Sequence, residues 1–176
     1  APAIARPVSL ADAAARPPAE RLRTGLEEFD RVLGGGLVPG SLVLLGGEPG
    51  ICKSTLASIA AARLAGAGRR VLYAGGEESE EQIRLRLARL GVKGADLYLL
   101  ADGRLDALQE AVETLRPAAV IVDSVQTMRH PELASAPGWV AHLREGPAFL
   151  LRLLKARDVA ALLIGHVTKE GTIAGP

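Results

Sequence analysis

Short apolar runs alternate along the chain with longer segments of helical periodicity. Each run consists mostly of consecutive Val, Ile, Leu and Ala residues rather than of alternating apolar and polar ones. Continuous runs of this kind are typical of strands buried on both faces of a parallel sheet. The strand–helix alternation therefore predicts an α/β fold, with a mostly parallel central sheet flanked by helices on both faces. The expected strands are residues 41–45, 71–74, 97–100, 119–122 and 160–164, and the expected helices are residues 53–64, 80–90, 104–115 and 145–157.

Two helix starts carry capping signals. Ser79 precedes the helix expected at 80–90, and Gln82 follows it three positions later, which is the spacing of a capping box. Thr24 and Glu27 have the same spacing at the start of a shorter amphipathic segment. We expect that segment to end at residue 33, because three glycines follow it and glycine is a common helix terminator.

The first 21 residues differ in composition from the rest of the chain. They are rich in Ala, Pro and Arg, and four prolines interrupt any long helix. We expect residues 1–21 to form an arm or linker, with one or two helical turns within residues 9–15. The remaining residues, 22–176, have the length of one ordinary domain.

Composition then narrows the classes of function. The 21 Lys and Arg residues nearly balance the 20 Asp and Glu residues, which argues against a histone-like polycation and against a disordered acidic tail. Aromatic residues make up only 3% of the chain, so a base-stacking surface is not expected. A single cysteine leaves no partner for an internal disulfide or for a cysteine-based zinc site. No membrane-length apolar stretch or signal peptide pattern is present, so we expect a cytoplasmic protein without a membrane partner.

A phosphate-binding pattern follows the first expected strand. Residues 46–56 read Gly-Gly-Glu-Pro-Gly-Ile-Cys-Lys-Ser-Thr-Leu, and the pattern G-x-x-x-x-G-K-[ST] is in register at Gly47, Lys53 and Ser54. In such a loop the backbone N–H groups and the helix N-terminus hold phosphate, the lysine neutralises β- and γ-phosphate oxygens, and the hydroxyl binds Mg²⁺. We therefore expect ATP or ADP to bind with Mg²⁺. The expected nucleotide contacts are Gly47, Glu48, Pro49, Gly50, Ile51, Cys52, Lys53, Ser54 and Thr55.

Cys52 stands where this pattern has its last glycine. If the backbone there has a positive φ, a side chain costs about 1–2 kcal/mol. The Cβ atom can also crowd the phosphates. Two interpretations stay open: the cysteine weakens nucleotide binding, or the loop tolerates it. A third, a redox-sensitive thiol activated by the helix N-terminus and Lys53, has a physical basis but less support.

Carboxylates follow two other expected strands. Asp123 ends the apolar run at 120–122 and is the expected Mg²⁺ ligand together with Ser54. The next residue is a serine, so the base that activates water must come from elsewhere. Glu77 and Glu78 follow the strand at 71–74, at the sheet edge where ligands bind in open α/β folds. We prefer Glu77 as the catalytic base and keep Glu78 as the alternative, although both also suit a helix N-terminus.

The fifth expected strand leads into another polar segment. His166 follows this strand directly and is a candidate contact for the γ-phosphate, although a lone histidine is more often structural. Lys169 is a candidate contact for phosphate, DNA or a neighbouring subunit.

Taken together, these motifs resemble the RecA-type ATPases, and most closely their bacterial DNA-repair branch. The resemblance covers about residues 20–176. It implies a RecA-like phosphate-loop ATPase domain at residues 22–176 and ATP hydrolysis with Mg²⁺. The matching segments are Arg-Thr-Gly at 23–25, Leu-Gly-Gly-Gly-Leu-Val-Pro-Gly-Ser at 33–41, the phosphate loop, Gly-Glu-Glu-Ser at 76–79, Asp-Ser-Val-Gln-Thr at 123–127, Ser-Ala-Pro-Gly at 135–138 and Gly-His-Val-Thr-Lys-Glu-Gly at 165–171.

The resemblance also implies partners and further domains. The family forms hexameric rings, works with recombination proteins and promotes branch migration on single-stranded DNA. Its members carry an N-terminal four-cysteine zinc finger, and they continue into a Lys-Asn-Arg-Phe-Gly motif and a Lon-protease-like domain. We therefore expect this chain to be an excised ATPase core, with zinc confined to the missing finger.

The segment 125–146 occupies the place of a DNA-binding loop in the family. It contains Arg129, His130 and Arg144, and the helix after it adds Arg152, Lys155 and Arg157.

Two other functions remain as alternatives. The first is an ATP-binding assembly module similar to the circadian-clock KaiC relatives, with slow or no hydrolysis. The second is a small-molecule kinase, which is less favoured because residues 102–116 show no sign of an acceptor lid.

Overall fold

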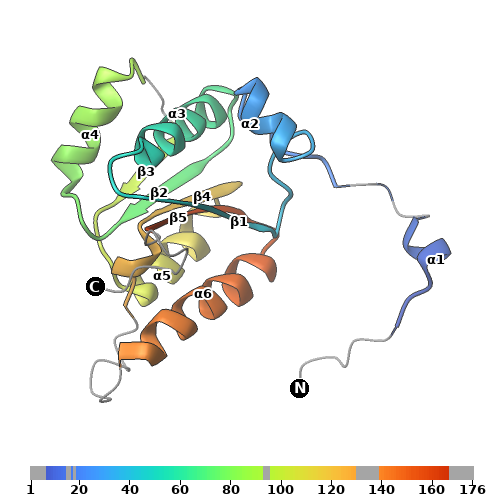
Figure 1. Ribbon diagram of the computed structural model, residues 1–176. Helices are drawn as coiled ribbons and strands as arrows, with labels where there is room; N and C mark the ends of the chain where they lie inside the picture. The colour runs from blue at the N-terminus through green and yellow to red at the C-terminus, as the bar shows by residue number, and fades with distance from the viewer. Residues whose placement is uncertain (1–6, 15–16, 18, 93–95, 130–138, 167–176) are drawn as a thin grey trace.

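Five parallel strands form the centre of the protein in the order β1-β5-β4-β2-β3. The computed structural model describes residues 7–14, 17, 19–92, 96–129 and 139–166. All four strand pairs in this part are parallel, and helices cover both faces of the sheet (Figure 1). The expected α/β fold is confirmed and agrees with a RecA-like core. The strands are β1 Leu42–Gly47, β2 Val71–Gly75, β3 Leu97–Leu100, β4 Ala119–Asp123 and β5 Ala160–His166.

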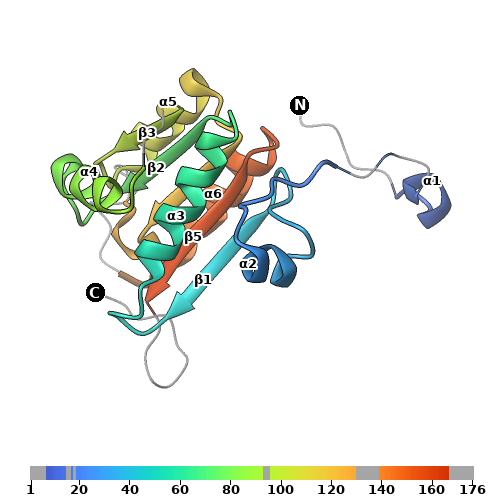
Figure 2. The ribbon, with the colours of Figure 1, turned by 90° about the horizontal axis from the view of Figure 1, so that it is seen from above.

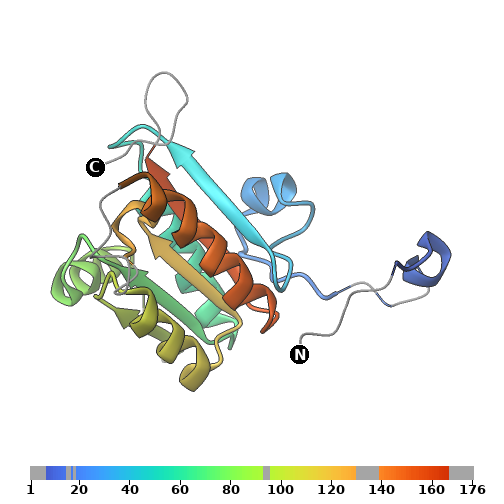
Figure 3. The ribbon, with the colours of Figure 1, turned by 90° about the horizontal axis from the view of Figure 1, so that it is seen from below.

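The helices divide into two layers, each with its own apolar core. Helices α3 and α4 cover one face together with the shorter α2 (Figure 2), and α5 and α6 cover the other (Figure 3). Residues that alternate along β2, β4 and β5 point into one core or the other, so these three strands are almost fully buried. This burial explains their continuous apolar runs. The helices are α1 Leu10–Ala14, α2 Glu27–Val32, α3 Lys53–Gly66, α4 Glu80–Arg89, α5 Leu105–Leu115 and α6 Trp139–Lys155, with a 3₁₀ turn at Val125–Thr127.

Two expectations about the helices are wrong. Helix α6 begins at Trp139, six residues before the expected start, and Pro147 lies inside it. Proline is common in the first helical turn, which makes the segment before it read as a loop. Helix α2 has Leu26 as its N-cap with no side-chain cap. Thr24 instead donates through its backbone N–H and its hydroxyl to Asp30 Oδ1, at 2.9 and 2.8 Å.

Other local expectations are confirmed. Ser79 and Gln82 form the capping box at the start of α4. Helix α1 lies within residues 9–15, and its Leu10 is 86% exposed (Figure 1). The division between an arm at 1–21 and a domain at 22–176 stays a prediction. None of the helices in the described part of the chain is both long and apolar enough to cross a membrane.

The carboxyl ends of the strands place the polar segments of the sequence along one edge. In the register of the sheet, Gly47 at the end of β1 lies beside His166 at the end of β5. Asp123 at the end of β4 lies between Gly75 of β2 and Ile164 of β5. Segments that are separated by up to 120 residues in the sequence thus meet at one edge.

Candidate active site

The phosphate loop connects β1 to α3 and encloses the side chain of Lys53. That side chain is nearly buried, and its Nζ donates to the carbonyl oxygens of Gly47 at 2.8 Å and Glu48 at 2.7 Å. An ammonium group has three N–H donors, so these two bonds fix its position and leave one donor available. A Cβ atom at Gly47 would lie 2.3 Å from Ile51 Cδ1, so the exposed Ile51 side chain would have to move if Gly47 were substituted.

Cys52 has the backbone conformation of a glycine. Its φ of +61° and ψ of +23° lie in the left-handed region, as expected if the loop keeps its usual shape. The residue is exposed and is the N-cap of α3, and its side chain makes no capping hydrogen bond. The loop therefore retains its conformation at the cost of strain at one residue.

The donor groups of this loop fit a phosphate. The first N–H groups of a helix have no partner within the helix, and α3 begins at Lys53, directly after the loop. Because no side chain caps this end, the N–H groups of its first turn are available to an anion, and the helix dipole favours negative charge there. Lys53 adds a positive charge at the same place.

Asp123, the expected metal ligand, is held by Tyr73. The Tyr73 hydroxyl donates to Asp123 Oδ2 at 2.7 Å, and the carboxylate side chain is 10% exposed. Burial raises the pKa of Tyr73, and the negative charge of Asp123 and the hydrogen bond to it raise this pKa further. The hydroxyl therefore keeps its proton and acts as the donor.

Arg86 of α4 lies against the same pair and connects it to helix α3. Its Nη2 donates to the Tyr73 hydroxyl oxygen at 2.8 Å, and its Nε donates to Ser58 Oγ at 3.2 Å. It also forms an ion pair with Glu78, and its guanidinium carbon lies 5.5 Å from the centre of the Tyr73 ring. Its Nη2 is 3.8 Å from Asp123 Oδ2, which is longer than a hydrogen bond.

The two neighbouring glutamates, Glu77 and Glu78, have different surroundings. Glu77 is exposed, and its Oε1 accepts a hydrogen bond of 2.8 Å from the hydroxyl of Ser124, which is fully buried next to Asp123. Glu78 is instead occupied by its ion pair with Arg86. The geometry thus separates two residues that the sequence cannot distinguish.

His166 lies next to the phosphate loop, where the register of β1 and β5 places it. Its carbonyl oxygen accepts a hydrogen bond of 3.0 Å from Gln126 Nε2. Two buried atoms at this place, His166 Nδ1 and Gln126 Oε1, have no hydrogen-bond partner among the residues that the structure describes. Both are therefore available to a water molecule or a ligand.

The expected DNA-binding residues do not gather at one place in the described structure. Arg129 is exposed, and its backbone pairs with that of Gly103. Arg157 lies at the other end of the sheet, where it forms an ion pair with Glu113. His130, Lys169 and the side chain of Arg144 lie outside the described residues.

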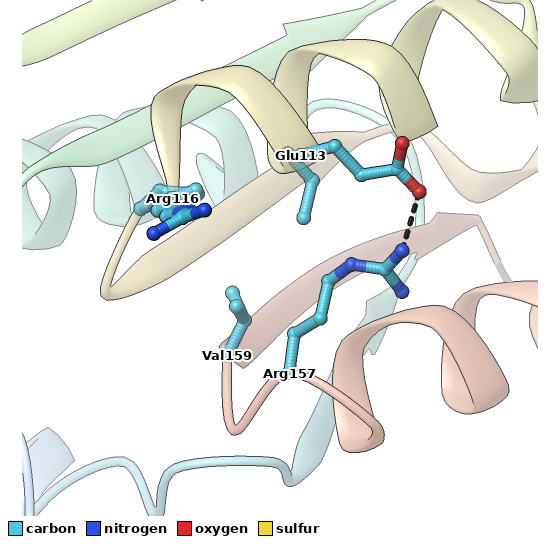
Figure 4. A pocket seen from close by; sticks show the side chains of 6 residues that line it. Glu113, Arg116, Arg157 and Val159 are labelled. Atoms are coloured by element: carbon cyan, nitrogen blue, oxygen red, sulfur yellow. Dashed lines mark hydrogen bonds and ion pairs between the residues drawn. The ribbon is translucent and has the colours of Figure 1, made fainter.

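That opposite end contains a pocket of about 390 Å³ (Figure 4). Its lining comes from the segments that precede β4 and β5, so it opens at the amino ends of these strands. The phosphate loop lies at their carboxyl ends, and the pocket is therefore separate from the candidate nucleotide site. The lining residues are Val112, Glu113, Arg116, Pro117, Arg157 and Val159.

Comparisons with known proteins agree with the motifs. Residues 10–172 match the model of a family described as "AAA domain". The DNA repair protein RadA of Listeria monocytogenes is 48% identical over 157 residues, which cover 89% of this chain and 34% of that protein. The RadA of Halalkalibacterium halodurans is 51% identical and that of Bacillus subtilis 47%, each over 156 residues, with the same coverage of both chains. The chain thus spans about a third of the length of these curated relatives.

Proposed function

Because the chain belongs to the AAA domain family and is homologous to DNA repair protein RadA, we propose that it is the ATPase core of a DNA repair protein. The observation that supports this most is the placement of three chemical elements at one sheet edge. The phosphate loop with Lys53, the carboxylate Asp123 and the carboxylate Glu77 come from three separate strand ends, and the parallel sheet aligns these ends.

Each residue has a definite part in this proposal. The loop N–H groups and Lys53 bind the phosphates of ATP or ADP. Further nucleotide contacts come from Gly47, Glu48, Pro49, Gly50, Ile51, Cys52, Ser54 and Thr55. Ser54, in the first turn of α3, and Asp123 would hold Mg²⁺. The metal ion would supply positive charge that offsets the charge of the phosphate oxygens. His166 contacts the terminal phosphate from the neighbouring strand.

Glu77 is the base in this proposal. A general base must reach the attacking water directly, so it needs an exposed carboxylate at the open side of the site. Glu77 is exposed and is oriented by Ser124, whereas Glu78 is occupied by Arg86. This difference favours Glu77 over Glu78.

A further part of the proposal concerns assembly and activity on DNA, which are properties of the whole protein. We propose that it forms a hexameric ring, that it acts with recombination proteins and that it promotes branch migration on single-stranded DNA. The relatives are DNA repair proteins by name, and Arg129, Arg152 and Lys155 are exposed cations available to a phosphate backbone. Contacts of this kind are independent of base sequence and weaken with salt.

The test is phosphate release from ATP, with and without single-stranded DNA, by this chain and by its Lys53→Ala variant. We expect hydrolysis that DNA stimulates and that the variant lacks. Nucleotide-dependent assembly without any effect of DNA would instead indicate an assembly module of the KaiC type.

A further inference from the structure

Between the carboxylate of Asp123 and the guanidinium of Arg86 stands a single neutral group, the hydroxyl of Tyr73. It donates to Asp123 Oδ2 at 2.7 Å and accepts from Arg86 Nη2 at 2.8 Å, while the two charged groups stay 3.8 Å apart. We propose that Tyr73 is a positioning residue, whose hydroxyl keeps the ion pair of Arg86 and Asp123 at 3.8 Å, too long for a direct hydrogen bond, and so leaves this carboxylate available to the metal ion. This inference rests on the proposed nucleotide site.

The need for such a spacer follows from competition for one carboxylate. An arginine and a carboxylate in contact form short, charge-assisted hydrogen bonds that are often bidentate. Here the side chains of Arg86 and Asp123 are only 18% and 10% exposed, so solvent screens their attraction weakly. A direct pair would occupy the oxygens that a divalent cation needs. A hydrogen bond from a neutral hydroxyl orients the carboxylate and leaves Oδ1 free.

Arg86 is held in place by groups other than Asp123. Glu78 offsets its charge, Ser58 accepts from its Nε, and the ring of Tyr73 lies below its guanidinium. The Ser58 hydroxyl in turn donates to the carbonyl oxygen of Ser54 at 2.7 Å. Arg86 thus links the segment that carries Ser54 to the Tyr73 hydroxyl.

Tyr73 is suited to this part by its location as well as by its chemistry. Its side chain is fully buried in the apolar core on one face of the sheet, and β2 pairs directly with β4, the strand that ends at Asp123. The ring cannot easily move in a packed core. The hydroxyl is therefore held in a fixed position between the Asp123 carboxylate and the Arg86 guanidinium.

The test is the Mg²⁺ dependence of nucleotide binding, with the fluorescent nucleotide mant-ADP as the probe. In Tyr73→Phe the ring stays and only the hydroxyl is lost, so Arg86 can move onto Asp123. We expect the Mg²⁺ concentration at half-saturation to rise roughly tenfold to a hundredfold, because the guanidinium then competes with the metal ion through a charge-assisted hydrogen bond to Asp123. Binding of mant-ADP in excess EDTA should stay as in the unmodified chain.

The double variant Tyr73→Phe/Arg86→Gln makes the test specific. Without the guanidinium nothing competes for Asp123, so we expect the Mg²⁺ midpoint to return close to that of the unmodified chain. The proposed role of Tyr73 would be overturned by an unchanged Mg²⁺ midpoint in Tyr73→Phe. It would also be overturned if the Mg²⁺ midpoint of the double variant were as high as that of the single variant. A melting curve shows whether Tyr73→Phe folds. If it does not fold, the Mg²⁺ midpoint of Arg86→Gln decides: a midpoint that does not rise supports the proposed role of Tyr73, and a raised midpoint overturns it.

Failure of the underlying function gives a different result. If the unmodified chain binds no mant-ADP with or without Mg²⁺, the proposed nucleotide site is wrong, and the spacer is overturned with it. If the unmodified chain binds and the variants show no Mg²⁺ effect, only the spacer is wrong.

Discussion

The two halves of the candidate site are built in different ways. The phosphate loop is one continuous stretch of backbone, in which Ile51 and Cys52 are exposed. Within the described residues, the Lys53 side chain hydrogen-bonds to backbone carbonyl oxygens at the start of this stretch. The other half consists of side chains from α3, β2, α4, β4 and the segments that follow β2 and β4, joined by hydrogen bonds between residues up to 50 positions apart. The loop thus depends on its backbone conformation, whereas the network depends on the identity of its side chains.

The largest expected effect concerns the network. Glu77→Gln removes the negative charge but keeps an oxygen that can accept from Ser124. A general base contributes about 10²–10⁴ in rate, so we expect turnover to fall by that factor while ADP binding stays unchanged. The measurement is single-turnover phosphate release. Glu78→Gln is the matched control and should change turnover less than about tenfold; if this variant alone stops turnover, the base assignment is wrong.

The next effect concerns the loop. Lys53→Ala removes the charge at the phosphate position, and a hydrogen bond to a charged group contributes about 1.5–3 kcal/mol. We expect the affinity for ADP to fall roughly a hundredfold, measured by calorimetry. Lys155→Ala, at an exposed lysine of α6, should leave the affinity unchanged. An unchanged affinity in Lys53→Ala would contradict the assignment of the loop.

The smallest effect separates backbone strain from nucleotide contact. Cys52→Gly removes the penalty for a left-handed side chain, so we expect the free energy of unfolding to rise by about 1 kcal/mol and nucleotide to bind more tightly. Arg116→Gly is the control, because Arg116 also has a positive φ (+48°) but lies at the opposite end of the sheet. It should stabilise the protein by a similar amount without changing nucleotide affinity.

Chemical denaturation with and without ADP measures both effects. If Cys52→Gly changes neither the free energy of unfolding nor the nucleotide affinity, the loop tolerates the cysteine fully.

The sequence located the backbone half of the candidate site, but it did not predict the side-chain contacts of the other half. The phosphate pattern is local, so its register placed Gly47, Lys53 and Ser54 without knowledge of the fold. Asp123 was recognisable because it ends an apolar strand. Tyr73 gave no signal of its part, because an aromatic residue inside an apolar run is usual in a strand.

Arg86 and Ser124 were missed for a related reason. Their partners are distant in the sequence, and only the strand order and the packing of α4 on α3 bring them together. The start of α6 was missed because a proline usually indicates the first turn of a helix. In the structure Pro147 lies inside the helix.

The most direct test of the central claim is calorimetric titration of ADP with Mg²⁺ into the unmodified chain, beside its Cys52→Gly variant. We predict saturable one-to-one binding by both chains, because the loop already has the conformation that phosphate binding requires. We expect higher affinity for the glycine variant, because glycine removes the backbone strain at residue 52. Absence of binding in both chains would contradict a nucleotide site at this edge of the sheet.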